Sequence, residues 1–439
     1  MKFRTFKGGA HPNDGKAMSR DAQIENLLPG KELVFPLSQH IGAPAKAVVN
    51  VGDRVLAGQL IGEKSGFISA NIYSSVSGIV KKIEPRLVAT GGMVQSVVIE
   101  NDELYEEAPR LHDKSPLELS REEIIDIIER AGIVGMGGAG FPTNVKLSPK
   151  NPEKIDSIIV NGAECEPYLT SDYRRMIEQP QELVKGLKIV LSLFDGAKGY
   201  FGIENNKPEA IRILSEMVKD EPDIFVVPLK TKYPQGGERC MIKAITDREI
   251  NSKMLPADAG CIVHNIDTIY AIYNAVYDGR PLTKRIITVT GDAIRRPSNF
   301  QVYLGTSLRE IADAAGGFVC EPEKIISGGP MMGFSFFNLD VPAVKGSSSV
   351  LAFTKDAVKA SSPSPCIRCA RCAKACPEHL LPMKLAALAD TGNMEEFRKL
   401  HGLECVECGC CSFVCPAKRQ VTQSVKSMKK MVIASSKKN

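Results

Sequence analysis

The chain has 439 residues, a length that suggests about three domains, with 43% hydrophobic residues, 24% charged residues and a formal net charge of +5. This composition is typical of an ordinary globular protein. The apolar stretches all fall short of the roughly 18 residues that a transmembrane helix needs. The N-terminus, "MKFRTFKGGAHPNDGK", has basic residues but no apolar segment and no small-residue cleavage site, so we expect that the protein is not exported.

Residues 33–84 alternate short β-branched runs with Gly, Pro and Asp, which predicts a small all-β unit with tight turns. Two of its segments, "VGDRVLAGQLIG" and "IYSSVSGIVKKI", resemble the halves of a biotinyl or lipoyl carrier domain, a flattened barrel of two small sheets. Lys64 lies in the loop that would present a carrier lysine, but the methionines that flank such a lysine are absent. We therefore expect a structural or docking role for this unit, with a carrier lysine as the alternative.

Residues 121–131 predict an amphipathic helix, because isoleucines recur at helical spacing opposite Glu and Arg, and Gly132 is a plausible stop. The loop that follows contains Gly135, Gly137, Gly138 and Gly140. Such a loop lets backbone N–H groups approach an anion that a Cβ atom would hold off, so a phosphate or pyrophosphate group is the expected ligand. The spacing matches neither G-x-G-x-x-G after a strand nor a Walker loop, and a flexible linker is the alternative.

Three junctions from strand to helix follow this loop, each with a polar turn. The strand "IDSIIVN" leads into "NGAECEPY", "DIFVVPL" leads into the glycine turn "YPQGGERC", and "GCIVHN" leads into the helix "IDTIYAIYNAV". This alternation predicts a doubly wound α/β fold, in which ligands bind at the carboxyl ends of the strands. The polar residues expected at that edge are Asn161, Glu164, Glu166, Glu238, His264, Asn265 and Thr268.

One cysteine pattern, C-x2-C-x2-C-x3-C-P, occurs twice near the C-terminus. This run holds 4Fe-4S clusters in bacterial two-cluster ferredoxins, where the fourth cysteine of each run ligates the other cluster. Zinc and disulfides are the alternatives, but eight thiols at this spacing exceed what a zinc site needs, and thiols kept for iron indicate a reducing compartment such as the cytoplasm. We expect one cluster on Cys366, Cys369, Cys372 and Cys415, and a second on Cys376, Cys405, Cys408 and Cys411.

Residues 417–439 hold seven Lys or Arg and no Asp or Glu, so the remaining 416 residues carry a net charge of about −2 (5 minus 7). Such a segment can attract anionic lipid headgroups or an acidic partner, or it can be a solvated, frayed terminus. It has no aromatic residue to stack on bases, and no nucleic-acid-binding module is recognisable elsewhere, so we expect no nucleic acid partner.

These motifs resemble a known family. "GMGGAGFPT", "NGAECEP" and "HNIDT" are similar to the flavin and nicotinamide site of the 51 kDa NADH-binding subunit of respiratory complex I. The N-terminal "FKGGAHP", the "LSQHIGAP" of residues 37–44, the carrier-like barrel and the double cysteine run resemble the C subunit of the Rnf complex more closely still. The second resemblance covers essentially the whole chain.

The resemblance implies a multidomain α/β protein. Its expected parts are an N-terminal segment with a barrel-sandwich (biotinyl/lipoyl-like) β domain, an α/β FMN- and NADH-binding domain like that of the 51 kDa subunit, a ubiquitin-like SLBB domain, a linker, a helical two-cluster ferredoxin domain and a basic tail. Between the two cysteine runs, helical periodicity predicts two long helices that cross beside the clusters. The expected bounds, in the same order, are 1–112, 113–282, 283–342, 343–364, 365–420 and 421–439.

The resemblance also implies a role for each candidate residue. The glycine-rich loop would hold FMN non-covalently, and Lys146 would lie near its phosphate or ribityl chain. Carboxylates would line the nicotinamide side, with capping or solvated carboxylates as the alternative interpretation of Glu164 and Glu166. The implied flavin residues are Gly135, Gly137, Gly138, Lys146, Asn161, Asn265 and Thr268, and the implied dinucleotide or further cofactor residues are Phe141, Glu164, Glu166 and Glu238.

Three positions depart from the complex I protein. Met136, Ala163 and His264 stand where that protein has Arg, Asp and Asn. Losing an Arg and an Asp changes the charge around the flavin, so the nucleotide affinity of that relative does not transfer to this chain.

The implied function is electron transfer between NAD(H), FMN and two 4Fe-4S clusters, in a subunit bound peripherally at the cytoplasmic face of the plasma membrane. The implied partners are the other Rnf subunits, including a ferredoxin-like iron–sulfur subunit and membrane subunits that move ions. No catalytic acid or nucleophile is expected, because the cofactors carry the chemistry. The alternatives are a soluble flavin and iron–sulfur reductase, such as a cobalamin reductase, and a non-catalytic relay scaffold.

Overall fold

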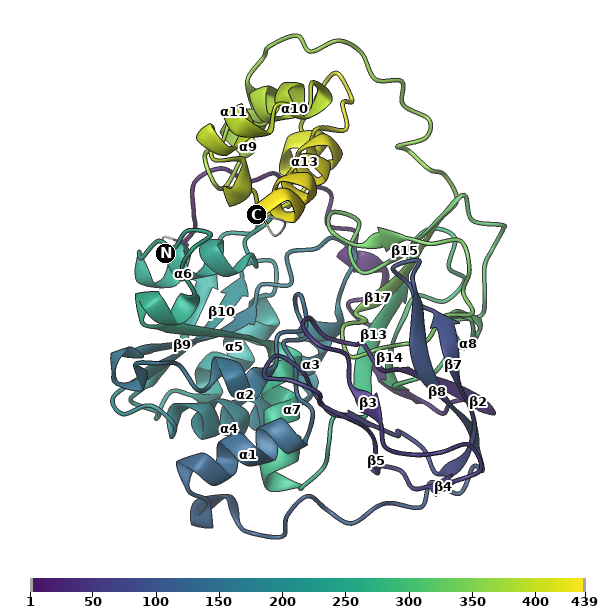
Figure 1. Ribbon diagram of the computed structural model, residues 1–439. Helices are drawn as coiled ribbons and strands as arrows, with labels where there is room; N and C mark the ends of the chain where they lie inside the picture. The colour runs from purple at the N-terminus through teal and green to yellow at the C-terminus, as the bar shows by residue number, and fades with distance from the viewer. Residues whose placement is uncertain (1–2, 437–439) are drawn as a thin grey trace.

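The computed structural model describes residues 3–436, and its largest part is a parallel sheet with helices on both faces, which we call the α/β domain (Figure 1). The strands lie in the order β11-β10-β9-β12, all parallel. The chain builds outward from β9 in one direction and then returns to its other side, which is the doubly wound arrangement predicted from the sequence. The strands are β9 (Ser157–Gly162), β10 (Lys198–Glu204), β11 (Ile224–Leu229) and β12 (Cys261–Asn265).

Helices cover this sheet on both faces because its strands are apolar on both faces. In β9, Ile158 and Val160 pack into the core on one side, whereas Ile159 packs into the core on the other, and all three are fully buried. Successive side chains of a strand point to opposite faces, so the uninterrupted run "SIIV" requires two covering layers. The first layer contains α1 (Arg121–Arg130), α3 (Ser171–Glu178), α4 (Pro180–Leu191), α5 (Pro208–Met217) and α7 (Ile266–Tyr277), and the second contains α6 (Glu238–Thr246).

The predicted β unit is a barrel of two small antiparallel sheets, of order β2-β8-β7-β4 and β3-β5-β6. Leu33, Phe35 and Ile99 are fully buried in its core. Lys64 forms an ion pair with Glu129 of α1, so it joins the barrel to the α/β domain, as expected for a structural rather than a carrier lysine. The strands are β2 (Glu32–Pro36), β3 (Lys46–Ala47), β4 (Arg54–Val55), β5 (Leu60–Glu63), β6 (Ile72–Tyr73), β7 (Gly78–Leu87) and β8 (Met93–Asn101).

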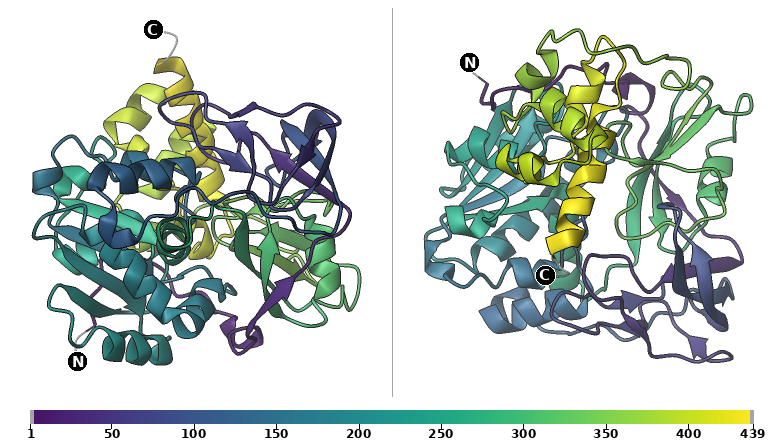
Figure 2. Two further views of the ribbon diagram at one scale, coloured as in Figure 1. Left: turned by 90° about the horizontal axis from the view of Figure 1, so that it is seen from below. Right: turned by 45° about the horizontal axis from the view of Figure 1, so that its top comes forward.

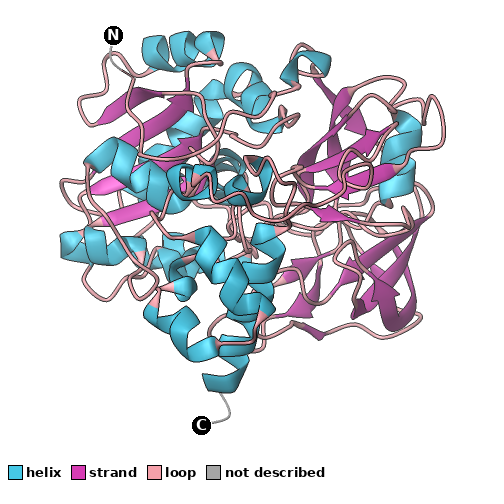
Figure 3. Ribbon diagram, turned by 90° about the horizontal axis from the view of Figure 1, so that it is seen from above, coloured by secondary structure: helices cyan, strands magenta, loops and turns pink. Residues whose placement is uncertain are grey.

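A second β-rich part, the SLBB sheet, lies beside the barrel, and the α/β domain lies on the other side of the molecule (Figure 3). Its strand order is β1-β14-β13-β17-β15-β16. Its elements are β1 (Ile24–Leu27), β13 (Lys284–Thr290), β14 (Ser298–Tyr303), α8 (Leu308–Ala314), β15 (Lys324–Ser327), β16 (Phe334–Ser335) and β17 (Ser349–Phe353).

Two strands of the SLBB sheet were not expected. β1 comes from the N-terminal segment and pairs parallel with β14. β17 lies inside residues 343–364, which we expected to be a linker, and it pairs with both β13 and β15. The linker prediction was wrong there because Val350 to Ala352 are apolar and fully buried. Burial of these side chains stabilises a strand, although the serines before them are typical of a loop. The extended segment that leads to the C-terminal part begins after β17 and runs over the top of the molecule (Figure 1).

The C-terminal part is helical. The two helices between the cysteine runs, α10 (Pro382–Asp390) and α11 (Met394–Lys399), are short, so the prediction of two long helices was wrong. The longest helix is α13 (Val421–Ser436), in the segment expected to be a basic tail. Val425, Met428 and Val432 bury one side of α13 in the core of this part, so residues 421–436 are not a frayed terminus, and residues 437–439 lie outside the described range. The remaining helices here are α9 (Arg371–Ala375) and α12 (Cys410–Phe413).

In the right-hand view of Figure 2, α13 lies in front of the junction between the α/β domain and the SLBB sheet. Lys426 of α13 lies 5.9 Å from the ring centroid of Phe334 in β16, which agrees with this placement. Within residues 3–436, no helix combines the length and the apolar character needed to cross a bilayer.

Lys345 joins three parts of the chain at a buried point. Its side chain is fully buried, and its ammonium group donates to the carbonyl oxygen of Gly132 at 2.7 Å and to that of Asn71 in the barrel. Gly132 has φ of +66°, and a Cβ atom there would lie 2.3 Å from the Asn71 oxygen, so only glycine fits this junction. Burial lowers the pKa of Lys345 to about 7.

Replacing Lys345 by Met should reduce the rise of thermal stability between pH 7 and pH 9. The folded chain releases the Lys345 proton near pH 7, whereas the unfolded chain keeps it until about pH 10.5, the ordinary value. The unfolded state therefore binds more protons in this window, and native stability rises with pH. Calorimetric Tm values at pH 7 and pH 9 test this, with exposed Lys31→Met as the control. Equal pH dependence in Lys345→Met and the native chain would contradict it.

Candidate cofactor sites

The glycine-rich loop lies against the N-terminal end of α7. It connects α1 to the short helix α2 (Thr143–Lys146). The backbone N–H of Met136 donates to Thr268 Oγ1 at 3.0 Å, and a Cβ atom on Gly137 would lie 3.0 Å from Asn265 Cβ. The loop therefore meets both polar residues at the start of α7. Because the first N–H groups of a helix have no partner within it, this junction favours an anionic group.

Asn161 and Asn265 end two neighbouring strands at the same level of the sheet. They are register partners in β9 and β12, between which the strand order reverses. Open α/β sheets bind their ligands in the crevice at this reversal. Asn161 donates to the Gly236 oxygen at 2.8 Å, and Asn265 donates to Asp172 Oδ2 at 2.7 Å. The structure thus brings Asn161, Asn265 and the loop to one edge of the sheet, where a ligand is expected to bind.

Asp172, in the first turn of α3, is a carboxyl group of this crevice that the sequence analysis missed. Besides accepting from Asn265, it donates its backbone N–H to Glu164 Oε1 at 2.8 Å. Burial, together with the charges of Glu164 and Asp267, raises the pKa of Asp172 to about 7. An acidic residue in the first turn of a helix is ordinary, so no sequence signal distinguished it.

Lys16 brings the N-terminal segment to the same edge. Its ammonium group lies 3.6 Å from Glu164 Oε2 and donates to the backbone oxygen of Glu166 at 3.0 Å. Behind it, buried Lys207 lies 3.8 Å from Glu204 Oε2. Glu164 therefore belongs to a buried group of charges rather than to the solvated surface. Neither lysine was predicted, because their contacts with this edge join segments about 150 and 40 residues apart in the chain.

Lys146 reaches the carboxyl end of β12. Its ammonium group donates to the Val263 oxygen at 2.9 Å and lies 3.3 Å from Oε1 of Glu238, the first residue of α6. His264 is buried next to them, and burial together with the charge of Lys146 holds the pKa of His264 well below its ordinary value. His264 is therefore neutral at pH 7.

The glycine-rich loop closes through Phe141, whose backbone oxygen accepts from Gly135 N at 2.8 Å. The Phe141 side chain is partly exposed, and it stacks on no other aromatic ring of the part that the structure describes. Its predicted stacking on a dinucleotide stays a prediction.

Several buried polar atoms near this edge have no hydrogen-bond partner among residues 3–436. Buried polar groups are nearly always hydrogen-bonded, so such a group of atoms indicates a polar ligand. A Cβ atom on Gly138 would meet nothing within 4 Å, so the loop also has open space before it. An open glycine loop beside unpaired donors and acceptors fits a phosphate-bearing cofactor such as FMN. The atoms without a hydrogen bond are Tyr233 OH, Gln235 Nε2, His264 Nε2 and Glu164 Oε2, the last of which has only the ion pair with Lys16.

Glu166, in contrast, contacts residues 328–333, which connect β15 to β16 of the SLBB sheet. Its carboxylate accepts from the backbone N–H groups of Met331 at 3.1 Å and Met332 at 3.0 Å. A Cβ atom on Gly329 would lie 2.0 Å from Glu166 Oε2. This segment covers the carboxylate that we expected to line the nicotinamide side, and sequence patterns give no sign of the contact because the two segments are about 165 residues apart.

Replacing Glu166 by Gln should raise the Tm at pH 8 but not at pH 5. Burial raises the pKa of Glu166 to about 7. A carboxyl group whose pKa is raised in the folded state stabilises the fold fully at pH values below its ordinary pKa of 4.5. This contribution to stability is lost as the pH rises through 7. We expect a gain of about 3 °C or more at pH 8 by calorimetry. Exposed Glu63→Gln is the control, and a lower Tm of Glu166→Gln at pH 8 would contradict the prediction.

The eight cysteines of the two motifs line two separate cavities in the C-terminal part. Each cavity takes three cysteines from one motif and the fourth from the other, which is the grouping that the ferredoxin spacing predicts. We call the first the distal site, lined by Cys366, Cys369, Cys372 and Cys415. We call the second the proximal site, lined by Cys376, Cys405, Cys408 and Cys411.

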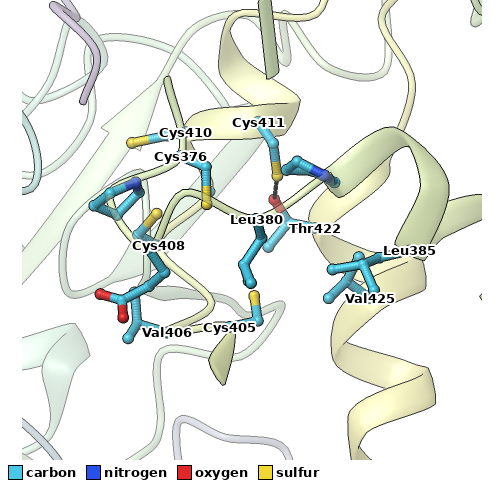
Figure 4. Close-up of a pocket in the computed structure, with 14 residues that line it drawn as sticks. Cys376, Leu380, Leu385, Cys405, Val406, Cys408, Cys410, Cys411, Thr422 and Val425 are labelled. Atoms are coloured by element: carbon cyan, nitrogen blue, oxygen red, sulfur yellow. Dashed lines mark hydrogen bonds between the residues drawn. The ribbon is translucent and has the colours of Figure 1, made fainter. Parts of the chain in front are cut away.

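The four sulfur atoms of the proximal site surround a common space (Figure 4). Such a set of four thiols fits an iron–sulfur cubane, whose irons each take one protein thiolate. Cys410 also lines this cavity, and its sulfur lies beside that of Cys408 and 3.7 Å from the backbone oxygen of Tyr233. Cys411 Sγ lies 3.2 Å from Thr422 Oγ1 of α13.

The proximal site faces the α/β domain. Arg239 of α6 pairs with Glu378 at 2.5 Å and Glu404 at 3.0 Å, on either side of the site. A Cβ atom on Gly409 would lie 3.0 Å from the backbone oxygen of Met331, in the same segment that covers Glu166. Met331 is therefore the link between the edge of the sheet and the proximal site.

The distal site has no such neighbours. Within residues 3–436, none of its lining residues makes a hydrogen bond or ion pair with the barrel, the α/β domain or the SLBB sheet. The two sites therefore stand in order, with the proximal one against the crevice and the distal one beyond it.

Four family models match the chain in order. They describe an RnfC barrel sandwich hybrid domain at residues 4–104, a Nuo51 FMN-binding domain at 128–274, an SLBB domain at 286–335 and a 4Fe-4S dicluster domain at 365–419. These matches confirm the predicted types of domain and their order, and with them the predicted FMN and iron–sulfur cofactors.

Curated relatives match over nearly the whole chain. The C subunit of the proton-translocating ferredoxin:NAD(+) oxidoreductase complex of Clostridium ljungdahlii is 46% identical, over 97% of this chain and 94% of the relative. The Na(+)-translocating counterpart of Acetobacterium woodii is 42% identical, over 100% of this chain and 99% of the relative. The C subunit of the ion-translocating oxidoreductase complex of Vibrio cholerae is 38% identical, over 92% of this chain and 52% of the relative.

Among solved structures, an NAD+-reducing NiFe-hydrogenase in the air-oxidized state aligns with a TM-score of 0.51 and 18% identity, covering 74% of this chain and 62% of that chain. This likeness concerns the fold alone. The identities of the curated relatives, at nearly full coverage, establish the family: the chain belongs to the C subunits of the Rnf-type, ion-translocating ferredoxin:NAD(+) oxidoreductase complexes.

Proposed function

We propose that this chain passes electrons between NAD(H), non-covalently bound FMN and two 4Fe-4S clusters, as the C subunit of an ion-translocating ferredoxin:NAD(+) oxidoreductase complex. The observation that carries the proposal is the order of its sites. The first site is the glycine loop, with polar atoms nearby that lack hydrogen bonds. The second is the four-cysteine proximal site, which faces the same edge of the sheet. The third is the four-cysteine distal site, which lies beyond the proximal one.

FMN can accept a hydride from NADH and give up its two electrons one at a time, which is how clusters accept them. The residues of this chain have to hold the flavin, orient the nicotinamide and exclude water. We assign the flavin to the loop glycines, to Lys146 and to the polar residues that end β9 and open α7. Those residues are Gly135, Gly137, Gly138, Lys146, Asn161, Asn265 and Thr268.

We assign the dinucleotide to Phe141, Glu164 and Glu238, and to Glu166 once residues 328–333 move off its carboxylate. Glu164 is supported by its buried Oε2, which has no hydrogen-bond partner among the described residues, and by the buried Lys16 ammonium group 3.6 Å from it. The role of Glu238 rests on its pairing with Lys146 at the end of the sheet. The eight motif cysteines are the proposed cluster ligands, in the two groups that line the distal and proximal sites.

The proposed partners are the other subunits of the complex, including an iron–sulfur subunit and the membrane subunits that move ions. The names of the relatives support this, since they are subunits of complexes that translocate protons or Na(+). We infer that the chain attaches peripherally, at the cytoplasmic face, because NAD(H) is a cytoplasmic substrate and a reducing compartment protects its thiols.

An anaerobic titration tests the proposal. The full chain is reconstituted with iron, sulfide and FMN, and is titrated with NADH and then dithionite while absorbance and EPR spectra are recorded. We expect about eight irons per chain, a flavin that NADH bleaches and two cluster signals. A chain that binds clusters but neither keeps nor reduces FMN would be a relay scaffold. Rapid reduction of added cobalamin by NADH would favour the soluble reductase instead.

A further inference from the structure

We propose that Arg285, near the start of β13 in the SLBB sheet, is a positioning residue for FMN. It holds the glycine-rich loop in the orientation that binds an anion, and it places a buried positive charge behind that loop. The inference rests on the proposed function, because it concerns the same flavin site. It adds a residue that lies outside all of the sequence motifs, in a part of the chain that follows the α/β domain.

Arg285 reaches from β13 to the glycine-rich loop. Its side chain is 3% exposed, and its Nη1 donates to the backbone oxygen of Met136 at 3.4 Å. The backbone N–H of Met136 donates to Thr268 Oγ1 at 3.0 Å, and the Met136 side chain is buried. Both backbone polar groups of Met136 are therefore held, the oxygen by the SLBB sheet and the N–H by α7.

The contact with Met136 also sets the direction of the next N–H group. In a trans peptide unit, the carbonyl oxygen and the N–H of the following residue point in opposite directions. The peptide bond between Met136 and Gly137 is trans, so a carbonyl that points to Arg285 turns the Gly137 N–H away from it. Within residues 3–436, neither Gly137 N nor Gly138 N has a hydrogen-bond acceptor. The loop therefore keeps two N–H donors for a phosphate group.

Arg285 belongs to a buried group of charges in which two guanidinium groups share one carboxylate. Asp267, in the first turn of α7, lies 3.0 Å from Arg175 Nε and 3.5 Å from Arg285 Nε, and all three side chains are 3% exposed. The contact with Arg175 is a hydrogen bond, whereas Arg285 Nε has no hydrogen-bond partner among the described residues. A buried charge that lacks a full partner is costly, so an anion held by the loop stabilises Arg285.

The ion pair with Asp267 does not by itself explain the second arginine. Arg175 already satisfies this carboxylate, and its guanidinium group is held 3.6 Å from the ring centroid of Tyr270. Asp172 does not remove the excess positive charge either. It forms no ion pair with Arg175 or Arg285 among the described residues, and burial raises its pKa to about 7, so it is only partly ionised at neutral pH. The contact of Arg285 with the loop is what distinguishes it.

The test uses the full chain, reconstituted with iron and sulfide and freed of flavin. Titration calorimetry under anaerobic conditions gives the Kd of FMN and the Kd of riboflavin, which lacks the phosphate group. The measured quantity is the ratio of the riboflavin Kd to the FMN Kd, because a variant that only loosens the pocket changes both affinities alike. Arg285→Met should lower this ratio at least about fivefold. Arg285→Lys, which keeps the charge, should lower it less.

Asp267→Asn should shift the ratio in the opposite direction. It removes the carboxylate that Arg285 shares, while its amide oxygen can still accept from Arg175. More of the positive charge of Arg285 is then available to the phosphate, so the ratio should rise. Both variants can lower stability, but a loss of stability alone gives no opposite shifts of this ratio.

Arg174→Met is the matched control. Arg174 is also buried, pairs with the carboxylate of Glu178 and donates to the backbone oxygen of Arg20 at 3.2 Å, but it forms no hydrogen bond with the glycine-rich loop. This variant should change the ratio by less than about twofold.

If Arg285→Met failed to fold, Arg285→Lys and Asp267→Asn would still decide the question. A ratio equal to that of the native chain in every Arg285 and Asp267 variant that folds would overturn the proposal. Bleaching of bound FMN by NADH, measured on the same native sample, would then leave the proposed function in place. A native chain that binds neither flavin would instead overturn the proposed function, and this inference with it.

Discussion

Replacing Cys376 by Ala should halve the iron content of the chain, from about eight irons to about four, and should stop electron transfer from NADH to a one-electron acceptor. Cys376 belongs to the first motif in sequence, but it lines the proximal site with three cysteines of the second motif. Its loss should leave that cluster without its fourth thiolate. FMN should still bleach with NADH, because the flavin crevice is separate from this cavity.

Double variants test the crossed grouping directly. Cys376→Ala combined with Cys405→Ala should lose no more iron than either single variant, because both act on the proximal site. Cys376→Ala combined with Cys366→Ala should lose nearly all iron, because the two act on different sites. Cys410→Ser is the matched control, since Cys410 falls outside the C-x2-C-x2-C-x3-C spacing of the second motif and its loss should leave the iron content unchanged. The opposite pattern of the two double variants would show that the motifs do not cross.

Replacing Gly138 by Val should abolish retention of FMN without destabilising the chain. A Cβ atom at this position would meet nothing within 4 Å, and Gly138 is not among the glycines with positive φ. The fold itself therefore tolerates a side chain there, so a loss of flavin in this variant reports on a ligand that the backbone approaches closely. We expect the flavin content after gel filtration to fall at least about tenfold, with a Tm within about 2 °C of the native value.

Gly92→Val is the matched control. Gly92 lies in the barrel, and a Cβ atom there also meets nothing within 4 Å. This variant should keep both the flavin and the iron of the native chain. If Gly138→Val retained FMN like Gly92→Val, the glycine loop would not be the flavin site, and the cysteine sites would need another electron source.

The sequence predicted the elements whose signals are local. The alternation of strand, polar turn and helix gave the α/β domain and its ligand edge, and cysteine spacing gave the crossed grouping of the two cavities. In both cases the prediction uses residues that lie close together in the sequence, namely a strand with the turn and helix after it, or the cysteines of one motif.

What the sequence did not predict depends on contacts between distant segments. β17 looked like linker because serines precede its short apolar run, and its strand character comes from β13 and β15 on either side. α13 looked like a tail because of its lysines, whereas its buried side is defined by α10. Tertiary contacts alone bring Asp172, Lys16 and residues 328–333 to the edge of the sheet. No sequence pattern distinguishes the two charged residues from ordinary surface charges.

The N-terminal segment has a consequence for biosynthesis. Arg4 bridges Leu229, Gly9 N donates to the Ala375 oxygen at 2.9 Å, and β1 completes the SLBB sheet. These residues precede their partners in the chain and find all of them only after position 375 has been made, which makes the docking of this segment a late step of folding. A Cβ atom on Gly8 would lie 2.7 Å from the Cys376 oxygen, so the same segment closes over one edge of the proximal site. All four cysteines of that site follow Ala375 in the chain, so the site and the segment that closes its edge are completed together, late in translation.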